Sequence, residues 1–222
     1  MIQSGKERRL VLRTQSASLI SARQQANGDF TGTFRSERGE EKPVRLSKIS
    51  EEQLPRLLQE VLAKRASRTF ADEDKDWGVP PTSRLRTERM HAPTPKEVPG
   101  ARTIRTNELR ALQGSSPAPL LIDVLQGSGH RTLSGAHWLS GAGEGAGNAA
   151  RERLRADLEK LTAGNKSLPV VFFCLSSECW LSYNASLRAI ELGYTNIYWF
   201  RGGTAAWQRA GFAMMEAVPF GR

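Results

Sequence analysis

The sequence predicts an α/β protein that has a parallel sheet in its second half and a small α+β unit before it. Three observations support this fold class. After residue 100, apolar strand runs alternate with helical segments, which is the pattern of β-α-β construction. Before residue 70, strand-like segments precede a single helix, and a proline-rich stretch lies between the two parts. A chain of 222 residues has room for this division.

The first unit, residues 1–70, is predicted to hold two strands and one helix. RLVLRT from Arg9 is one strand, and GDFTGTFRS from Gly28 is another because its apolar and small residues alternate. SKISEEQLPRLLQEVLAKR is predicted as a helix, with Ser50 and the two following glutamates as its start signal. Its apolar stripe consists of Leu54, Leu57, Leu58, Val61 and Leu62. The role of this unit is not indicated by its sequence.

Residues 71–100 form the boundary between the two parts. The segment contains five prolines and clustered charge, and it has no sustained apolar period. It is therefore expected to be a linker or an extended strap.

The second part, residues 101–219, contains the strongest strand and helix signals. The predicted strands are 119–125, 136–139, 168–174 and 196–200, and the predicted helices are 148–163, 181–192 and 204–210. Asn148 is the expected N-cap of the first helix, and Gly164, Gly193 and Gly211 are expected to end the three helices. The alternation of strands and helices favours a parallel sheet.

Composition argues against several classes of protein. The net charge of +9 is spread evenly: residues 1–100 carry 19 basic and 14 acidic side chains, and the rest of the chain contributes +4. This diffuse charge does not favour nucleic-acid binding. No apolar run approaches the roughly 18 residues that a membrane span needs. Since the N-terminus as given has no apolar signal region, we expect a cytoplasmic protein, or a periplasmic one if an export signal was trimmed.

Both cysteines lie in the segment CLSSECW, residues 174–180. This segment joins the end of a buried strand to the start of a helix, at the sheet edge where open α/β proteins bind ligands. Loop amides and the helix N-terminus can stabilise an anion there, and such settings lower the pKa of a cysteine. Cys174 is therefore either a reactive thiolate or a small buried residue that ends a core strand.

The segments LLIDVL, SGAHWL, VVFFC and LSYNASLRAIELGYTNIYWFRGGTAAWQRAG together resemble a rhodanese-like domain over about residues 100–215. The resemblance implies a three-layer α/β/α domain that transfers sulfur. Cys174 would attack a small sulfane-sulfur donor, hold the sulfur as a persulfide and pass it to a thiol acceptor, either a small molecule or a protein. The active-site loop would consist of Leu175, Ser176, Ser177, Glu178 and Trp180, with the amides of residues 175–178 as its anion cradle.

The chain also departs from the family pattern. Ser177 and Cys179 stand where rhodanese loops commonly place a glycine and an arginine, and Glu178 adds a negative charge. A carboxylate beside the thiol would repel thiosulfate, which makes thiosulfate a poor candidate donor. The Cys-spacer-Cys-Trp pattern is similar to that of the CxxCW rhodanese-like proteins associated with pyrroloquinoline-quinone-dependent catabolism.

Cys179 has two interpretations. If its Cα lies within roughly 7 Å of that of Cys174, its thiol can resolve a persulfide on Cys174 and form a disulfide. Alternatively, Cys179 is a small side chain that fills the place of the arginine.

Asp123, His130 and Arg201 are the further candidates for the substrate pocket. Arg201 follows the last strand at the same sheet edge as Cys174 and is either a cation near the thiolate or an exposed arginine in a turn. The three histidines are too scattered for a metal site, and we expect neither a metal nor a cofactor. The predicted function is sulfane-sulfur transfer. The alternative is a catalytically silent interaction module whose N-terminal unit binds a protein partner.

Overall fold

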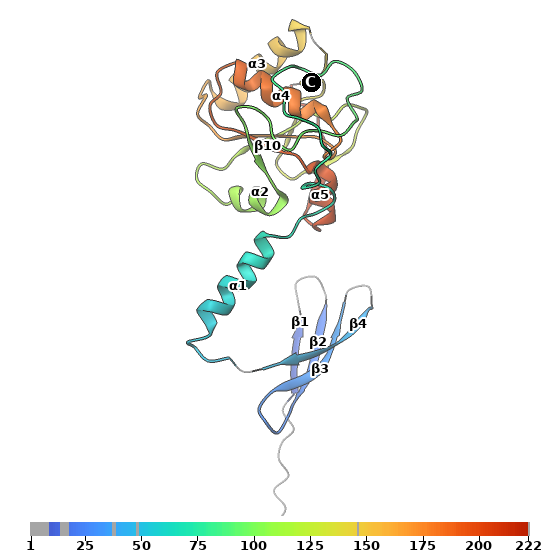
Figure 1. Cartoon of the computed structure of the whole chain (residues 1–222), viewed down its shortest axis with the longest axis vertical. Coiled ribbons are helices and arrows are strands. Elements are labelled where there is room, and N and C mark those ends of the chain that lie inside the picture. The colour runs from blue at the N-terminus through green and yellow to red at the C-terminus, as the bar shows by residue number, and fades with distance from the viewer. Residues whose placement is uncertain (1–8, 14–17, 37–38, 48, 146, 222) are drawn as a thin grey trace, which may run out of the picture. The chain divides into compact units, whose positions relative to one another are not determined.

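The computed structural model describes residues 9–13, 18–36, 39–47, 49–145 and 147–221. The chain divides into two compact units, Met1–Ala63 and Lys64–Arg222, and the boundary falls within helix α1 (Leu54–Ala66) (Figure 1). Within the described ranges, no helix has the length and apolar character needed to cross a bilayer.

The first unit contains a four-stranded antiparallel sheet in the order β1-β2-β3-β4. Its strands are β1 (Arg9–Arg13), β2 (Leu19–Gln24), β3 (Phe30–Arg35) and β4 (Glu41–Leu46). β1 and β3 confirm the two predicted strands. β2 and β4 were not predicted, and Pro43 within β4 is a residue that argues against a strand when the sequence is considered alone.

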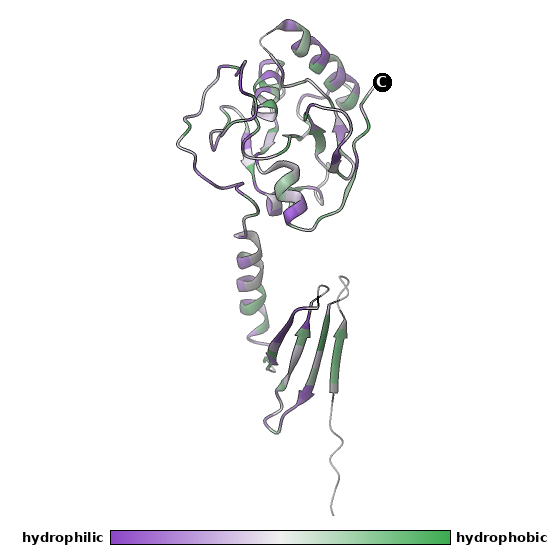
Figure 2. Cartoon of the chain, turned by 90° about the vertical axis from the view of Figure 1, so that its right-hand side faces the viewer, coloured by the Kyte–Doolittle hydropathy of each residue, from purple (hydrophilic) through white to green (hydrophobic). Residues whose placement is uncertain are grey.

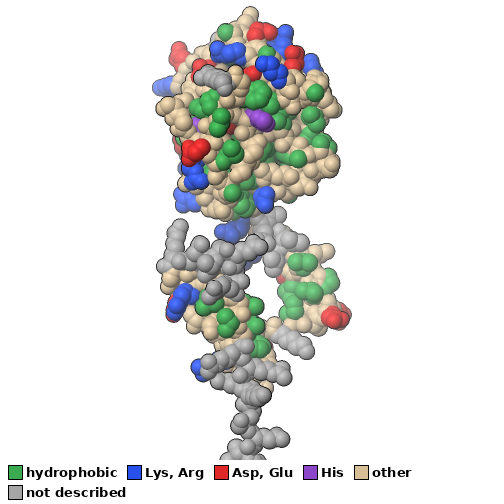
Figure 3. Space-filling view, turned by 180° about the vertical axis from the view of Figure 1, so that it is seen from behind, with side chains coloured by type: hydrophobic (Ala, Val, Ile, Leu, Met, Phe, Trp, Pro, Cys, Tyr) green, Lys and Arg blue, Asp and Glu red, His purple; other side chains and the backbone are tan. Residues whose placement is uncertain are grey.

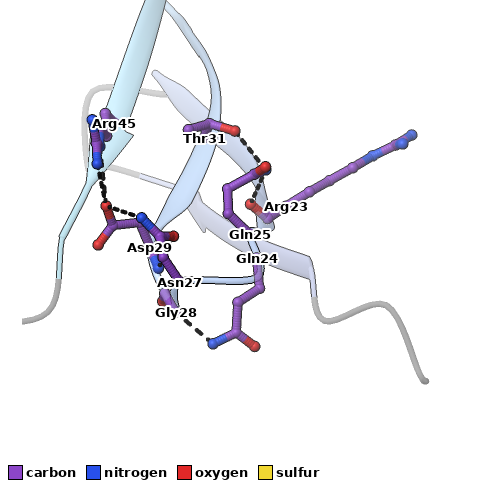
Figure 4. Close-up of polar contacts among 8 residues, drawn as sticks. All are labelled: Arg23, Gln24, Gln25, Asn27, Gly28, Asp29, Thr31 and Arg45. Carbon is purple, nitrogen blue, oxygen red and sulfur yellow. Dashed lines mark hydrogen bonds and ion pairs between the residues drawn. The ribbon is translucent and has the colours of Figure 1, made fainter.

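Polar contacts hold the turn between β2 and β3 (Figure 4). The amide of Gln25 donates to the carbonyl of Asp29, and the Asn27 side chain accepts from the Asp29 amide. From β4, Arg45 donates to the Asp29 carboxylate at 2.7 Å, and this hydrogen bond lowers the pKa of Asp29. This bond ties the turn to β4, the strand beside β3, and thereby fixes the register of the sheet.

Helix α1 starts later than the sequence predicts. Ser50 and Gln53 bond each other reciprocally, the Ser50 hydroxyl accepting from the Gln53 amide and the Gln53 side chain accepting from the Ser50 amide. This is the bonding pattern of a capping box, and it lies in the turn that precedes the first helical residue, Leu54. The apolar stripe is exposed where its side chains are described: 51% for Leu54, 37% for Leu57 and 54% for Leu58. Hydrophobic and hydrophilic residues are mixed along this helix (Figure 2).

The second unit is built on a five-stranded parallel sheet in the order β5-β10-β9-β6-β8. The strands are β5 (Arg102–Ile104), β6 (Leu120–Asp123), β8 (His137–Trp138), β9 (Val170–Phe173) and β10 (Ile197–Phe200). The four strands predicted for this part are all present, and the parallel sheet is confirmed.

Helices cover both faces of this sheet. Along β9, Val170 and Phe172 pack in one apolar cluster, and Val171 and Phe173 pack in another on the opposite face. The first cluster includes residues of α3 (Asn148–Thr162) and α4 (Trp180–Glu191), and the second includes residues of α2 (Thr106–Leu112) and α5 (Gly203–Arg209). The predicted three-layer α/β/α arrangement is therefore confirmed.

Charges of both signs lie on the surface of this unit. On the face that Figure 3 shows, Lys and Arg side chains are interspersed with Asp and Glu. The even distribution of charge along the sequence thus corresponds to a mixed distribution on this face.

The helix ends follow the predicted glycines in part. α4 and α5 stop just before Gly193 and Gly211, whose φ angles of 88° and 78° are left-handed. The predicted N-cap of α3 is wrong by one residue. Gly147 occupies that position with extended backbone, and Asn148 is the first helical residue. Glycine takes the extended cap conformation readily and makes no side-chain bond there.

Several short elements were not predicted. They are β5, α2, β7 (Arg131–Leu133) and β11 (Met214–Glu216), and β7 pairs with β11 in a separate antiparallel sheet. The three strands have three residues each, which is too short to show a period in sequence, and they form because each has a neighbouring strand to pair with. Helix α2 has seven residues, and its buried Leu109 packs in the apolar cluster on that face of the sheet.

Residues 71–100, the linker or strap of the sequence analysis, contain no helix or strand and lie against α4. The hydroxyl of Tyr183 donates to the carbonyl of Thr82 and accepts from its amide, each at 2.9 Å. The Asn184 side chain pairs in the same way with both backbone groups of Arg86. Burial raises the pKa of Tyr183, so its hydroxyl remains a donor. Two side chains of α4 thus replace a backbone ladder for this segment.

The same segment also reaches the cysteine loop. Both the amide and the hydroxyl of Thr94 donate to the carbonyl of Ser177, at 3.1 and 2.6 Å. Thr94 is fully buried. We refer to residues 71–100 as the strap.

The core packing makes a first prediction. Leu158 of α3 is fully buried in the cluster shared with α4, so Leu158→Ala should lower the free energy of unfolding by about 2–5 kcal/mol. Lys160 is exposed on the same helix, and Lys160→Ala should stay within about 0.5 kcal/mol of the parent. Urea unfolding measures both. Equal effects of the two substitutions would contradict the buried position of Leu158.

The strap makes a second prediction. Thr94→Val removes the hydroxyl that bonds Ser177 and Arg201, and should destabilise the protein by about 1–3 kcal/mol because buried polar groups lose partners. Thr94→Ser keeps the hydroxyl and should cost less than about 1 kcal/mol. Amide hydrogen exchange should show faster exchange around the loop in the valine variant alone. Similar exchange in both variants would rule out a role for this hydroxyl in fastening the strap.

Candidate active site

Cys174 lies at the carboxyl end of β9, the central strand of the parallel sheet. The loop that follows runs to Cys179, which is the N-cap residue of α4. Of the last two strand residues, Phe172 pairs with neighbouring strands on both sides and Phe173 pairs with a strand on one side. Both residues are completely buried. The position of Cys174 is therefore set by the sheet.

The segment after β10 packs directly on this loop. The amide of Thr204 donates to the carbonyl of Cys174, and the amide of Ala205 donates to the carbonyl of Leu175, both at 2.9 Å. Gly203 has a left-handed φ of 58°, and a Cβ at this position would collide with the carbonyl of Cys174. Only glycine allows the two loops to approach so closely.

The two cysteines are joined by a disulfide, and their Cα atoms lie 6.4 Å apart. This separation meets the condition of roughly 7 Å for direct sulfur chemistry between them. Cys174 and Cys179 are both buried, with 1% and 0% of their surface exposed. The structure therefore shows the oxidised state of the pair.

A serine that the sequence analysis did not single out lies at the sulfur of Cys174, and a tryptophan bonds this serine. The hydroxyl oxygen of Ser182 is 3.4 Å from Sγ of Cys174, and it accepts a hydrogen bond of 2.9 Å from Nε1 of Trp199. The carbonyl oxygen of Cys179 is also 3.4 Å from this sulfur. Ser182 follows Cys179 by three residues, a helical spacing that places both on one side of α4.

The loop contains unused backbone donors. The Glu178 amide donates to the hydroxyl of Ser176. Across the described residues, the amides of Leu175, Ser176 and Ser177 have no hydrogen-bond partner within the protein. Donors of this kind are available to an anion that binds at the loop.

The loop side chains differ in exposure. Leu175 is 45% exposed and Glu178 is exposed, whereas Ser177 is buried. Trp180 is buried against the strap, where its amide bonds the carbonyl of Met90 and its indole N–H bonds that of Pro93. The loop thus presents one apolar and one acidic side chain to solvent.

Arg201 is 2% exposed, so the alternative of an exposed arginine in a turn is wrong. Its guanidinium donates to both the hydroxyl and the carbonyl of Thr94 and to the carbonyl of Glu73. Burial lowers the pKa of Arg201, and the nearby carboxylates Asp74, Asp76 and Asp72 oppose this shift. Arg201 therefore reaches the cysteine loop through Thr94, which bonds Ser177.

Asp123 and His130 lie together at the end of β6. The buried Asp123 carboxylate accepts from the hydroxyl of Thr132, from Nε2 of His130 at 2.8 Å and from the amide of Leu125. The His130 ring packs edge-on against Trp138. These contacts hold the β6–β7 connection, and a role in a substrate pocket stays a prediction for both residues. Within the described ranges, no group of three or more His, Cys, Asp or Glu side chains is arranged to hold a metal ion.

Two solved structures are similar to part of the chain. A thiosulfate sulfurtransferase from Pseudomonas aeruginosa is 17% identical, with a TM-score of 0.40, over 54% of this chain and 21% of that chain. A rhodanese-like domain from Anabaena sp. is 19% identical, with a TM-score of 0.39, over 55% of this chain and 83% of that chain. The match thus spans about a fifth of the Pseudomonas enzyme. No curated protein sequence matches the chain.

The family model of the rhodanese-like domain matches residues 105–210. These residues include the sheet strands from β6 to β10, all four helices around the sheet and the complete cysteine loop. This segment, just under half of the chain, is therefore similar to the rhodanese-like domain family.

Proposed function

We propose that this domain transfers sulfane sulfur through a persulfide on Cys174. The observation that carries the proposal is the position of this cysteine: it ends the central strand of a rhodanese-like domain and precedes three loop amides that have no partner among the described residues. Such amides can stabilise both a thiolate and the terminal sulfur anion of a persulfide.

The proposed reaction has two balanced halves. The thiolate of Cys174 attacks the outer sulfur of the donor, a sulfur–sulfur bond forms, and the donor's leaving group departs with the electron pair of the broken bond. The negative charge then rests on the terminal sulfur of the persulfide. In the second half, the thiolate of an acceptor attacks this terminal sulfur and restores the Cys174 thiolate. The donor is a small molecule, and the acceptor is a small thiol or a protein thiol.

Cys179 provides a second route out of the persulfide. Its thiol gives its proton to the terminal sulfur and its sulfur attacks the inner sulfur, so the terminal sulfur leaves as hydrosulfide and the Cys174–Cys179 disulfide remains. A new cycle then requires two electrons from an external thiol reductant. The Cα separation of 6.4 Å and the disulfide itself support this route.

The charge of the loop limits the donor. Residues 174–180 contain the exposed carboxylate of Glu178 and no basic residue. A doubly charged anion such as thiosulfate is repelled by this carboxylate, which favours less charged sulfane-sulfur donors.

We further infer that the chain is related to the CxxCW rhodanese-like proteins that accompany pyrroloquinoline-quinone-dependent catabolism. The sequence of Cys174, Cys179 and Trp180 supports this placement. The alternative function of a catalytically silent interaction module is not favoured by these observations.

Mass spectrometry of single-cysteine variants tests the function. The reduced protein is incubated with thiosulfate or, separately, with 3-mercaptopyruvate, and the mass of the Cys174 peptide is measured. Cys179→Ser should gain one sulfur on Cys174 and accumulate the persulfide, because the resolving thiol is absent. Cys174→Ser should gain none, because the remaining cysteine lies at the helix N-cap and not at the strand end.

The parent protein controls for the disulfide route. It should form the Cys174–Cys179 disulfide after loading and release hydrosulfide. Sulfur on Cys179 in the Cys174→Ser variant, or an unmodified Cys174 with every donor in the Cys179→Ser variant, would refute the assignment.

A further inference from the structure

We propose that Ser182 is a catalytic residue whose hydroxyl donates a hydrogen bond to the sulfur of Cys174 and stabilises the anionic form of that sulfur. This inference deepens the proposed function, on which it rests for the role of Cys174. It adds to the backbone cradle a side chain that comes from α4, outside the loop.

The direction of the hydrogen bond follows from the chemistry of the three groups. The indole N–H of Trp199 can only donate, so the hydroxyl oxygen of Ser182 is the acceptor in their contact at 2.9 Å. The single proton of Ser182 then points to another acceptor. Among the described residues, the only other group that contacts this hydroxyl is Sγ of Cys174, at 3.4 Å.

The arrangement is rigid because all three side chains are buried. Ser182 is 2% exposed, Trp199 is 0% exposed and Cys174 is 1% exposed. Trp199 lies on β10, which neighbours β9 in the sheet. Strand pairing therefore fixes the position of the indole N–H that donates to Ser182. The hydroxyl of Ser182 is therefore already oriented toward Sγ in the oxidised pair, so little reorganisation is required when the reduced sulfur ionises.

The carbonyl of Cys179 has the opposite effect on the same sulfur. This carbonyl oxygen lies 3.4 Å from Sγ, so it can accept a hydrogen bond from a neutral thiol, and it repels a thiolate. Ser182 offsets this preference for the neutral form. The contacts of Ser182 and of the Cys179 carbonyl both act on the sulfur of Cys174, and they distinguish this sulfur from that of Cys179.

The test measures thiolate formation directly and needs neither a sulfur donor nor an acceptor. In reduced Cys179→Ser protein, Cys174 is the only thiol, and its ionisation is followed by ultraviolet thiolate absorbance as a function of pH. Adding Ser182→Ala removes the donor to the charged form, so the ionisation midpoint should rise by about one pH unit. At a fixed pH below the midpoint, the thiolate fraction should then fall about tenfold.

Ser186→Ala is the matched control. Ser186 is a buried serine one turn further along α4, and its hydroxyl bonds the backbone carbonyl of Ser182 without contacting the sulfur. This substitution should leave the midpoint unchanged. Trp199→Phe keeps an aromatic ring but loses the N–H, and should raise the midpoint by less than Ser182→Ala because Ser182 is still present but no longer oriented.

The outcomes separate this inference from the proposed function. An unchanged midpoint in Ser182→Ala, or an equal rise in Ser182→Ala and Ser186→Ala, overturns the role of Ser182. If Ser182→Ala does not fold, an unchanged midpoint in Trp199→Phe overturns it instead. A raised midpoint in a protein that loads no sulfur from any donor would support the hydrogen bond and count only against sulfur transfer.

Discussion

The burial of β9 between two parallel neighbours and two helical layers is the constraint on which the site depends. Each of its four residues is completely buried, and they point alternately into the two apolar clusters. A strand that is held on both edges and both faces ends at a fixed point in space. Cys174 is the first residue beyond that point, so its backbone is positioned by the core and the cysteine loop needs to position only its own amides.

A second constraint comes from the strap, which covers the loop and the start of α4. Its hydrogen bonds to the loop and to α4 join residues that lie more than 80 positions apart in sequence, such as Thr94 with Ser177 and Thr82 with Tyr183, which share two bonds each. The buried guanidinium of Arg201 donates three hydrogen bonds to this fastening, two to Thr94 and one to Glu73. As a result, Arg201, which the sequence suggested as a cation near the thiolate, contributes to the position of the loop.

The electrostatic environment of the sulfur is consequently built from neutral dipoles. The available donors are backbone amides, the Ser182 hydroxyl and the N-terminus of α4, while the nearest fixed charge in the loop itself is the carboxylate of Glu178. Dipoles of this kind stabilise an anion without attracting a second one from solution as strongly as a cation would. This arrangement suits the proposed function, in which Cys174 carries a negative persulfide and highly charged donors are disfavoured.

The sequence by itself determined the elements with long or strongly apolar patterns. The runs at 168–174 and 196–200 predicted β9 and β10, Gly193 and Gly211 marked the ends of two helices, and the order of these elements placed Cys174 at the carboxyl edge of a parallel sheet. These features depend on local periodicity and on the conformational preference of glycine, which a single sequence displays.

Only the tertiary structure decided which distant groups meet. The three-residue strand β5, the contact of Thr94 with the loop, the burial of Arg201 and the approach of Ser182 to the sulfur all depend on partners far away in the chain. A threonine in a proline-rich segment and a serine within a helix carry no signal of these roles, because the same residues occur commonly in turns and on helix surfaces. Their function arises from pairing across the sheet and from packing against it, which local sequence does not encode.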